Sequence, residues 1–213
     1  MKLLAIDVGN SRAHAALFQN GRRVRLIEGA PWPKADIIAA ATVRPSYSLP
    51  RGTKILTQDF PPLVRNRTRK PDTVGPDRLA AASAAYADAK GACVAVTIGT
   101  ALTVSVVNGK GDFVGGLISP GLRLQAGVLH EETELLPQVE PRRAKSIVGK
   151  STPAAIEAGI SFAVEGLLRE VRREVGKVPI YGSGGDGNLF RDLFDHWRPH
   201  LVLEGIDCSY RHA

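Results

Sequence analysis

The chain has 213 residues, a net charge of +7 and two cysteines, and 44% of its residues are hydrophobic. This composition excludes an intrinsically disordered chain, and the length suits one large domain or two domains of roughly 100 residues each. No apolar run approaches the roughly 20 residues of a membrane helix, and two cysteines are too few for a disulfide framework. We therefore expect a cytoplasmic globular protein with no membrane segment and no secretory leader.

The positive charge suits anionic small molecules as well as nucleic acid. The densest basic clusters, residues 65–70 and 142–150, lack interleaved aromatic side chains. The composition therefore argues against nucleic acid as a partner.

The predicted elements begin with two strands, residues 2–8 and 13–18, on either side of a turn at Gly9. Short strands follow at 39–43 and 54–56, and an alanine-rich helix is predicted over residues 78–90. The remaining predictions are strands at 93–98, 102–107 and 113–118, helices at 122–136 and 153–175, a strand at 178–181, a helix near 189–196 and a strand at 201–203. A hairpin, further strands and a helix, followed by the same again, are typical of a duplicated α/β protein.

The duplication is visible in the sequence itself, because residues 4–21 resemble residues 94–111. Gly9 aligns with Gly99 in this comparison, and each follows an apolar strand. Asp7, however, aligns with Thr97, so the copies differ at the residue best suited to chemistry. Two such glycine turns suggest a protein that holds a polyphosphate between two similar halves.

The first turn has the sequence Asp-Val-Gly-Asn-Ser. Gly9 lets the backbone approach a phosphate without a Cβ, and Asn10 and Ser11 add short donors. Asp7 is suited to hold Mg²⁺ directly or through water. An ordinary hairpin turn, with Asp7 and Asn10 as turn formers, explains the same residues.

A second motif is Gly75-Pro76-Asp77-Arg78, at the start of the predicted alanine-rich helix. Asp77 is either an N-cap or first-turn acid, or a base that accepts a hydroxyl proton beside an anion-binding Arg78. The glycine-rich segments 115–121 and 181–186 either admit a nucleobase or ribose close to the backbone or serve only as tight turns.

In their order and spacing, these motifs together resemble those of type III pantothenate kinases, bacterial enzymes of the actin-like ATPase superfamily. The likeness also includes Gly99-Thr-Ala-Leu-Thr103, Gly116-Leu-Ile-Ser-Pro-Gly121 and Ser151-Thr152. It implies an α/β fold, namely a duplicated actin-like (ribonuclease H-like) ATPase fold with two mixed-sheet domains. The implied halves are residues 1–80, with the first phosphate motif, and 81–213, with the second phosphate motif and the nucleotide and dimer contacts.

The resemblance also implies a function, which is the ATP-dependent phosphorylation of pantothenate in coenzyme A biosynthesis by a homodimer. Asp77 would be the catalytic proton acceptor, Mg²⁺ would accompany ATP, and a monovalent cation (K⁺ or NH₄⁺) would bind near Thr97. The implied ATP-binding residues are Asp7, Val8, Gly9, Asn10, Ser11, Arg12, Ala13, His14 and Thr100. The implied substrate-binding residues are Thr68, Gly75, Pro76, Asp77, Arg78 and Thr152.

Four positions differ from the family pattern. Thr97 replaces the aspartate that binds the monovalent cation, and Ser105 replaces a later aspartate. His14 replaces a lysine of the first motif, and Thr68 replaces a tyrosine that lines the substrate site. Two other functions therefore stay open, which are a non-catalytic regulatory relative and a kinase of another small hydroxy acid.

Overall fold

A computed structural model describes residues 1–213, which form two compact units. Unit 1 consists of Met1–Ala95, Ser105–Gly116 and His200–Ala213, and unit 2 of Val96–Val104 and Leu117–Pro199. The predicted limit between two halves, at residues 80/81, falls inside a helix of unit 1. The division into halves at residues 80/81 therefore stays a prediction, and the two compact units have other bounds.

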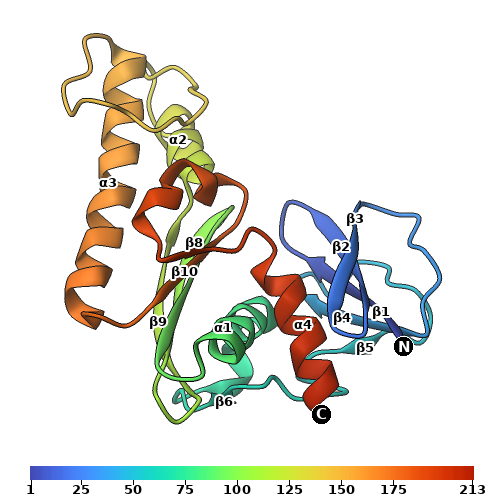
Figure 1. Ribbon diagram of the computed structural model, residues 1–213. Helices are drawn as coiled ribbons and strands as arrows, with labels where there is room; N and C mark the ends of the chain where they lie inside the picture. The colour runs from blue at the N-terminus through green and yellow to red at the C-terminus, as the bar shows by residue number, and fades with distance from the viewer. The chain divides into compact units, whose positions relative to one another are not determined.

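Unit 1 contains a five-stranded sheet in the order β3-β2-β1-β4-β5 (Figure 1). Strand β1 pairs antiparallel with β2 and parallel with β4, so it lies at the centre of the sheet. Its residues after Lys2 are all buried, as its nearly continuous apolar sequence requires for a central strand. The bounds are β1 (Lys2–Val8), β2 (Ala13–Gln19), β3 (Arg22–Glu28), β4 (Ile37–Thr42) and β5 (Lys54–Ile55).

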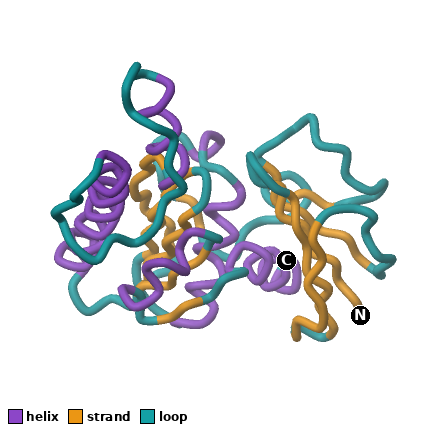
Figure 2. Tube along the Cα trace, turned by 90° about the horizontal axis from the view of Figure 1, so that it is seen from above, coloured by secondary structure: helices purple, strands orange, loops and turns teal.

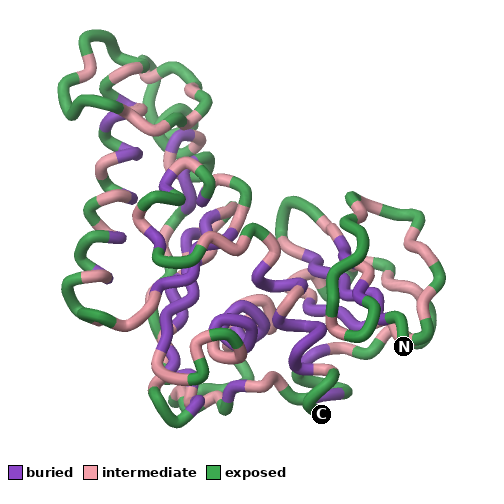
Figure 3. Tube along the Cα trace, viewed as in Figure 1, coloured by how far each residue is buried: buried purple, intermediate pink, exposed green.

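Two helices of unit 1, α1 (Pro76–Ala89) and α4 (Leu201–His212), lie against each other. Their contact is close because small residues face one another: a Cβ on Gly205 would lie 1.8 Å from the Ala80 carbonyl oxygen. Figure 3 shows buried residues along both helices, and Figure 2 shows the helix that leads to the C-terminus beside the first sheet.

The prediction of a strand at 201–203 is wrong, because these residues begin α4. Leu201, Val202 and Leu203 form a short apolar run that suits a strand or a buried helix equally. The helix is favoured because residues 205–209 continue its buried face against α1.

A second sheet has the strand order β11-β10-β7-β8-β9-β6. The strand at 93–98 has the predicted bounds, and those at 101–107 and 112–120 extend the predicted ones by one to three residues. The bounds are β6 (Arg65–Asn66), β7 (Cys93–Ile98), β8 (Ala101–Val107), β9 (Asp112–Pro120), β10 (Ile180–Ser183) and β11 (His196–Trp197).

Unit 2 carries the longest helix, α3 (Thr152–Val175), which begins one residue before its predicted start. Ser151 is the N-cap of α3, and its Oγ accepts a hydrogen bond from the Ala154 amide (3.4 Å). Helix α2 (Leu122–Glu131) ends five residues before the predicted 136. The helix predicted near 189–196 is instead the 3₁₀ segment η2 (Asp186–Leu193) followed by β11, and a short 3₁₀ turn, η1 (Pro71–Thr73), precedes α1.

No helix of the structure combines the length and the apolar character that crossing a membrane would require.

Candidate functional site

In unit 1, the carboxyl ends of the parallel strands β1 and β4 meet the first turn of α1. Asp7 lies on β1 opposite His14 of β2, and the amide of Val43, just after β4, donates to the Val8 carbonyl (3.0 Å). A Cβ on Gly75 would lie 2.4 Å from Oδ1 of Asp77 and 3.8 Å from a methyl group of Val43. Gly75 therefore leaves room for the Asp77 carboxylate beside these strand ends, where ligands bind in open α/β sheets.

The two carboxylates interact electrostatically. Asp7 is only 8% exposed, and its Oδ1 has no hydrogen-bond partner. Burial, and secondarily the charge of Asp77, raises the pKa of Asp7 to about 7. Burial also raises the pKa of Asp77, against the opposing effects of backbone hydrogen bonds and the charge of Arg78. Carboxylates perturbed in this way are typical of sites that bind a cation or transfer a proton.

The carboxylate pair also bears on how a divalent cation would be held. The 213 residues contain no group of three or more His, Cys, Asp or Glu side chains that would hold a metal by itself. Mg²⁺ in kinases usually takes one or two carboxylates and completes its shell with water and phosphate oxygens. The unpartnered Oδ1 of Asp7 suits that kind of site.

The turn after β1 is closed by a hydrogen bond within the turn, from the Gly9 amide to the Arg12 carbonyl (2.9 Å). The prediction that the glycine amides face an anion therefore does not hold for the N–H of Gly9 in this structure. Asn10 and Ser11 are exposed, and the Asn10 carbonyl accepts a hydrogen bond from Nη1 of Arg44 (3.3 Å).

Two histidines lie near the carboxylates. Nε2 of His14 is 3.7 Å from Oδ2 of Asp7, and its ring centroid is 6.4 Å from that of His200, at the start of α4. Burial lowers the pKa of both histidines, for His200 with a further contribution from Arg23. Both rings are therefore mainly neutral at pH 7.

The second motif is also placed in unit 1, but not with Asp77 as the helix cap. Gly75 is the N-cap of α1, Pro76 follows it, and Asp77 lies in the first turn as an acidic residue. The guanidinium of Arg78 lies over the Phe113 ring at 5.5 Å. Thr68 is held in its loop by Asn66. The Oγ1 and the backbone amide of Thr68 both donate hydrogen bonds to Oδ1 of Asn66, at 2.9 Å and 3.1 Å.

In unit 2, glycines of two segments, Gly121 and Gly184, contact the backbone at residues 98–100. The Gly121 amide donates to the Thr100 carbonyl (2.9 Å), and a Cβ on Gly121 would lie 1.9 Å from the Gly99 carbonyl oxygen. Gly184 has φ +92°, and a Cβ there would lie 2.3 Å from the Ile98 carbonyl oxygen. The structure therefore brings together turns that are far apart in the sequence, through direct backbone contact.

This contact allows a direct test of stability. Gly121 has an ordinary φ of −70°, so the cost of Gly121→Ala comes from the clash with the Gly99 carbonyl. We expect a loss of about 2 kcal/mol or more, because overpacking typically costs 1–3 kcal/mol. Thermal unfolding would then occur about 4–8 °C lower, whereas Gly185→Ala, whose Cβ would meet nothing within 4 Å, serves as the control. Equal melting temperatures for the two variants would contradict this packing.

The other two predicted residues of unit 2 are less informative. Thr97 is half-buried on β7, and Thr152 is the exposed first residue of α3. Their cation-binding and substrate-binding roles stay predictions.

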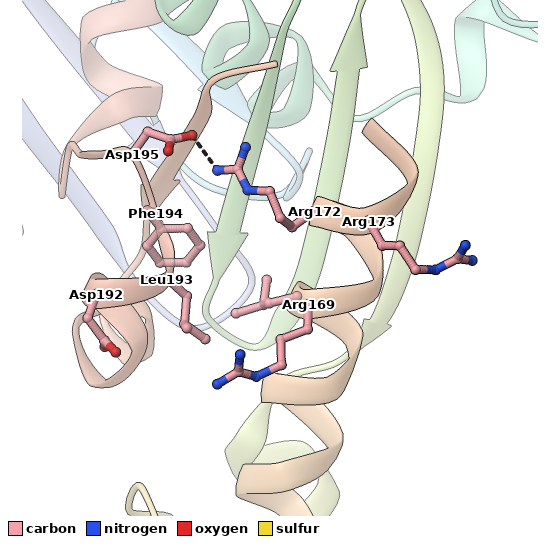
Figure 4. Close-up of a pocket in the computed structure, with 8 residues that line it drawn as sticks. Arg169, Arg172, Arg173, Asp192, Leu193, Phe194 and Asp195 are labelled. Atoms are coloured by element: carbon pink, nitrogen blue, oxygen red, sulfur yellow. Dashed lines mark hydrogen bonds and ion pairs between the residues drawn. The ribbon is translucent and has the colours of Figure 1, made fainter. Parts of the chain in front are cut away.

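A separate pocket of about 470 Å³ lies between α3 and the chain at the end of η2 and just after it (Figure 4). Its charged residues are paired, as in the contact between Arg172 and Asp195, and no predicted site residue lines it. Its lining consists of Leu168, Arg169, Arg172, Arg173, Asp192, Leu193, Phe194 and Asp195.

Sequence reasoning missed three residues near the unit 1 site, which are Arg44, Tyr47 and His200. Arg44 and Tyr47 lie in a proline-punctuated loop with no recognisable motif, and His200 is brought in by α4 from almost 190 residues away. A pattern of neighbouring residues could not have indicated any of them.

Comparison with solved structures identifies the fold. A protein of Campylobacter jejuni described as a conserved Baf family transcriptional activator superposes with a TM-score of 0.68 at 20% identity, covering 98% of both chains. A protein of Sinorhizobium meliloti described as a 2-dehydro-3-deoxygalactonokinase gives a TM-score of 0.61 at 14% identity, covering 99% of this chain and 98% of that chain. These similarities, with the two mixed sheets, confirm the predicted actin-like α/β fold.

Sequence comparison identifies the family. The type III pantothenate kinase of Dehalococcoides mccartyi strain 195 is 35% identical over 156 residues, which are 70% of this chain and 60% of the relative. That of Legionella pneumophila strain Corby is 37% identical over 148 residues, or 65% of this chain and 58% of the relative. The chain thus spans about 60% of the length of the curated relatives it matches. A family model described as type III pantothenate kinase matches residues 52–174, more than half of the chain, and the chain therefore belongs to the type III pantothenate kinase family.

Proposed function

We propose that this protein is an ATP-dependent kinase that phosphorylates pantothenate to 4'-phosphopantothenate, the first step of coenzyme A biosynthesis. The observation that carries the proposal is the pair of interacting carboxylates formed by the buried Asp7, near the end of β1, and the half-buried Asp77, in the first turn of α1. Family membership supplies the substrate class.

Asp77 is the proposed proton acceptor for the primary hydroxyl of pantothenate. The hydroxyl oxygen attacks the γ-phosphorus of ATP, the bond from that phosphorus to the β,γ-bridging oxygen breaks, and ADP leaves. Asp77 takes the hydroxyl proton, which its raised pKa favours. Arg78 would hold the anionic substrate in position, together with Gly75, Pro76, Thr68 and Thr152.

Asp7 is the proposed contact to the metal of the nucleotide. Mg²⁺, when bound with ATP, neutralises charge that develops on the phosphates during transfer. Asp7 offers an unpartnered, buried oxygen toward such a cation, and a nearby cation would return this carboxyl to its ionised form. The turn from Val8 to His14 would contact ATP, and the ATP-binding role of Thr100 stays a prediction.

Three finer points belong to the same proposal. Thr97 would contribute a hydroxyl to a monovalent cation site, K⁺ or NH₄⁺, in place of a carboxylate. The protein would be a cytoplasmic homodimer. Exposed apolar residues of α2, Leu124, Val128 and Leu129, support an association surface in unit 2.

The test is a phosphorylation assay with ATP, Mg²⁺ and pantothenate, with and without K⁺, read by ADP release and by mass spectrometry of the product. We expect pantothenate-dependent ADP release and a product heavier by one phosphoryl group. Folded protein that binds ATP but gives no product with any monovalent cation would overturn the catalytic assignment.

A second candidate is a kinase of another small hydroxy acid, and Thr68 is the observation that favours it. Its side chain is short and already bonded to Asn66, so this part of the site differs from one lined by a tyrosine. Competition of other hydroxy acids against pantothenate in the same assay distinguishes the two, because the preferred substrate has the larger kcat/KM.

A further inference from the structure

The turn after β1 presents an electrostatic difficulty for the ligand proposed to bind there. A polyphosphate at this turn would lie near two carboxylates, Asp7 and Asp77. The amide of Gly9 is already bonded to the Arg12 carbonyl, so the backbone offers fewer donors than the glycine motif suggests. A fixed positive charge beside the turn would offset both the repulsion by the carboxylates and the missing backbone donor.

The histidines of the site do not supply that charge. The ring of His14 lies close to Asp7 of β1, opposite Glu28 of β3 and near His200 of α4 and Arg12 of the turn. Nε2 of His14 is 3.7 Å from Oδ2 of Asp7, so this ring faces a carboxylate of the site. Arg12 is charged, but it is exposed on the turn itself.

Arg44 is a charged residue that the structure fixes to the turn. Its backbone is held by Thr42, whose Oγ1 accepts from the Arg44 amide and donates to the Arg44 carbonyl, both at 3.1 Å. Its guanidinium lies 5.1 Å from the ring centroid of Tyr47, and its Nη1 donates to the Asn10 carbonyl (3.3 Å). A guanidinium has five N–H donors, so most remain for a ligand.

We propose that Arg44 is a phosphate-binding residue of the nucleotide site and that Tyr47 positions its guanidinium. This inference rests on the proposed kinase function, since it assigns a ligand to the same turn. The planar fork of arginine matches two phosphate oxygens at once, whereas lysine provides a point charge. The ring of Tyr47 limits the freedom of the guanidinium, so less order is lost when phosphate binds.

The experiment measures Kd by calorimetry for ATP, ADP and AMP with Mg²⁺. Arg44→Gln is expected to weaken ATP binding by about 10- to 100-fold, the range for a lost charge-assisted contact, and AMP binding less. The Kd values of Arg44→Lys and Tyr47→Leu for ATP should lie between those of wild type and Arg44→Gln. Arg51→Gln, an exposed arginine of the same segment, is the matched control and should bind ATP as wild type does.

The series separates phosphate binding from mere support of the turn. A loss that is the same for ATP, ADP and AMP would overturn the proposal, because a structural defect does not depend on the number of phosphates. Wild-type affinity for ATP in Arg44→Gln would overturn it as well.

The same experiments distinguish a failure of the proposed kinase function from a failure of the role proposed for Arg44. Wild type that binds ATP but phosphorylates no pantothenate refutes the catalytic assignment, while a phosphate-dependent loss in Arg44→Gln still supports the role of Arg44. Wild type that binds no ATP refutes both.

Discussion

Asp77→Asn is expected to lower kcat for pantothenate phosphorylation by about 10²- to 10⁴-fold, the usual contribution of a positioned general base. An asparagine has nearly the same shape, but its amide cannot accept the hydroxyl proton. Burial raises the pKa of Asp77, which makes this carboxyl a better base than an exposed aspartate. Steady-state kinetics with ATP and pantothenate measure the effect.

The control is Asp72→Asn, an exposed acid in the neighbouring segment η1, which should keep the wild-type kcat. The melting temperature of Asp77→Asn should not fall below that of wild type, since the variant removes a carboxylate whose charge is disfavoured by burial. Full activity in Asp77→Asn would refute the assignment of the base.

Asp7→Asn is expected to stabilise the ligand-free protein at pH 8 while abolishing Mg²⁺-dependent turnover. Asp7 has a pKa of about 7 in the folded protein, whereas the ordinary pKa of an aspartate in an unfolded chain is 3.8. The folded state therefore binds more protons between these values, and its stability falls as the pH rises through this window. A shift of about 3 units corresponds to about 4 kcal/mol at most, and the new amide offsets part of that gain.

The measurement is urea unfolding of wild type and Asp7→Asn at pH 4 and pH 8, without nucleotide or divalent cation. The difference in free energy of unfolding between the two proteins should be small at pH 4 and should favour the variant at pH 8. Asp72→Asn, at an exposed position, is the control variant. A variant that is less stable than wild type at pH 8 would show that the ionised Asp7 is stabilised by contacts of the folded chain.

Sequence patterns predicted the buried strands well, because those strands have short, continuous apolar sequences between clear turn residues. The bounds of β1 and β7 were predicted without error. Strand β3 was missed because its sequence, Arg-Arg-Val-Arg-Leu-Ile-Glu, is rich in charge and mostly exposed at the edge of its sheet. The start of α4 was predicted as a strand. For an apolar run of three residues, only the contact with α1 decides between a strand and a buried helix.

The site was predictable only as far as it is local in the sequence. The hairpin around Gly9 was predicted, and in the structure it places Asp7 opposite His14. The interaction of Asp7 with Asp77 joins residues 70 positions apart. The support of the turn by Arg44 depends on a loop conformation that no motif encodes.

The position of α4 in unit 1 has a consequence for how the chain folds while it is being synthesised. Besides its contact with α1, this last helix reaches the segment before β6, where the Leu63 amide donates to the Oγ of Ser209 (3.2 Å) and the rings of Phe60 and Tyr210 meet edge to face. Helix α1 is therefore synthesised well before α4, the helix that packs against it. The nascent chain must keep the apolar face of α1 from aggregating until then, and its contacts of long sequence separation favour slow folding.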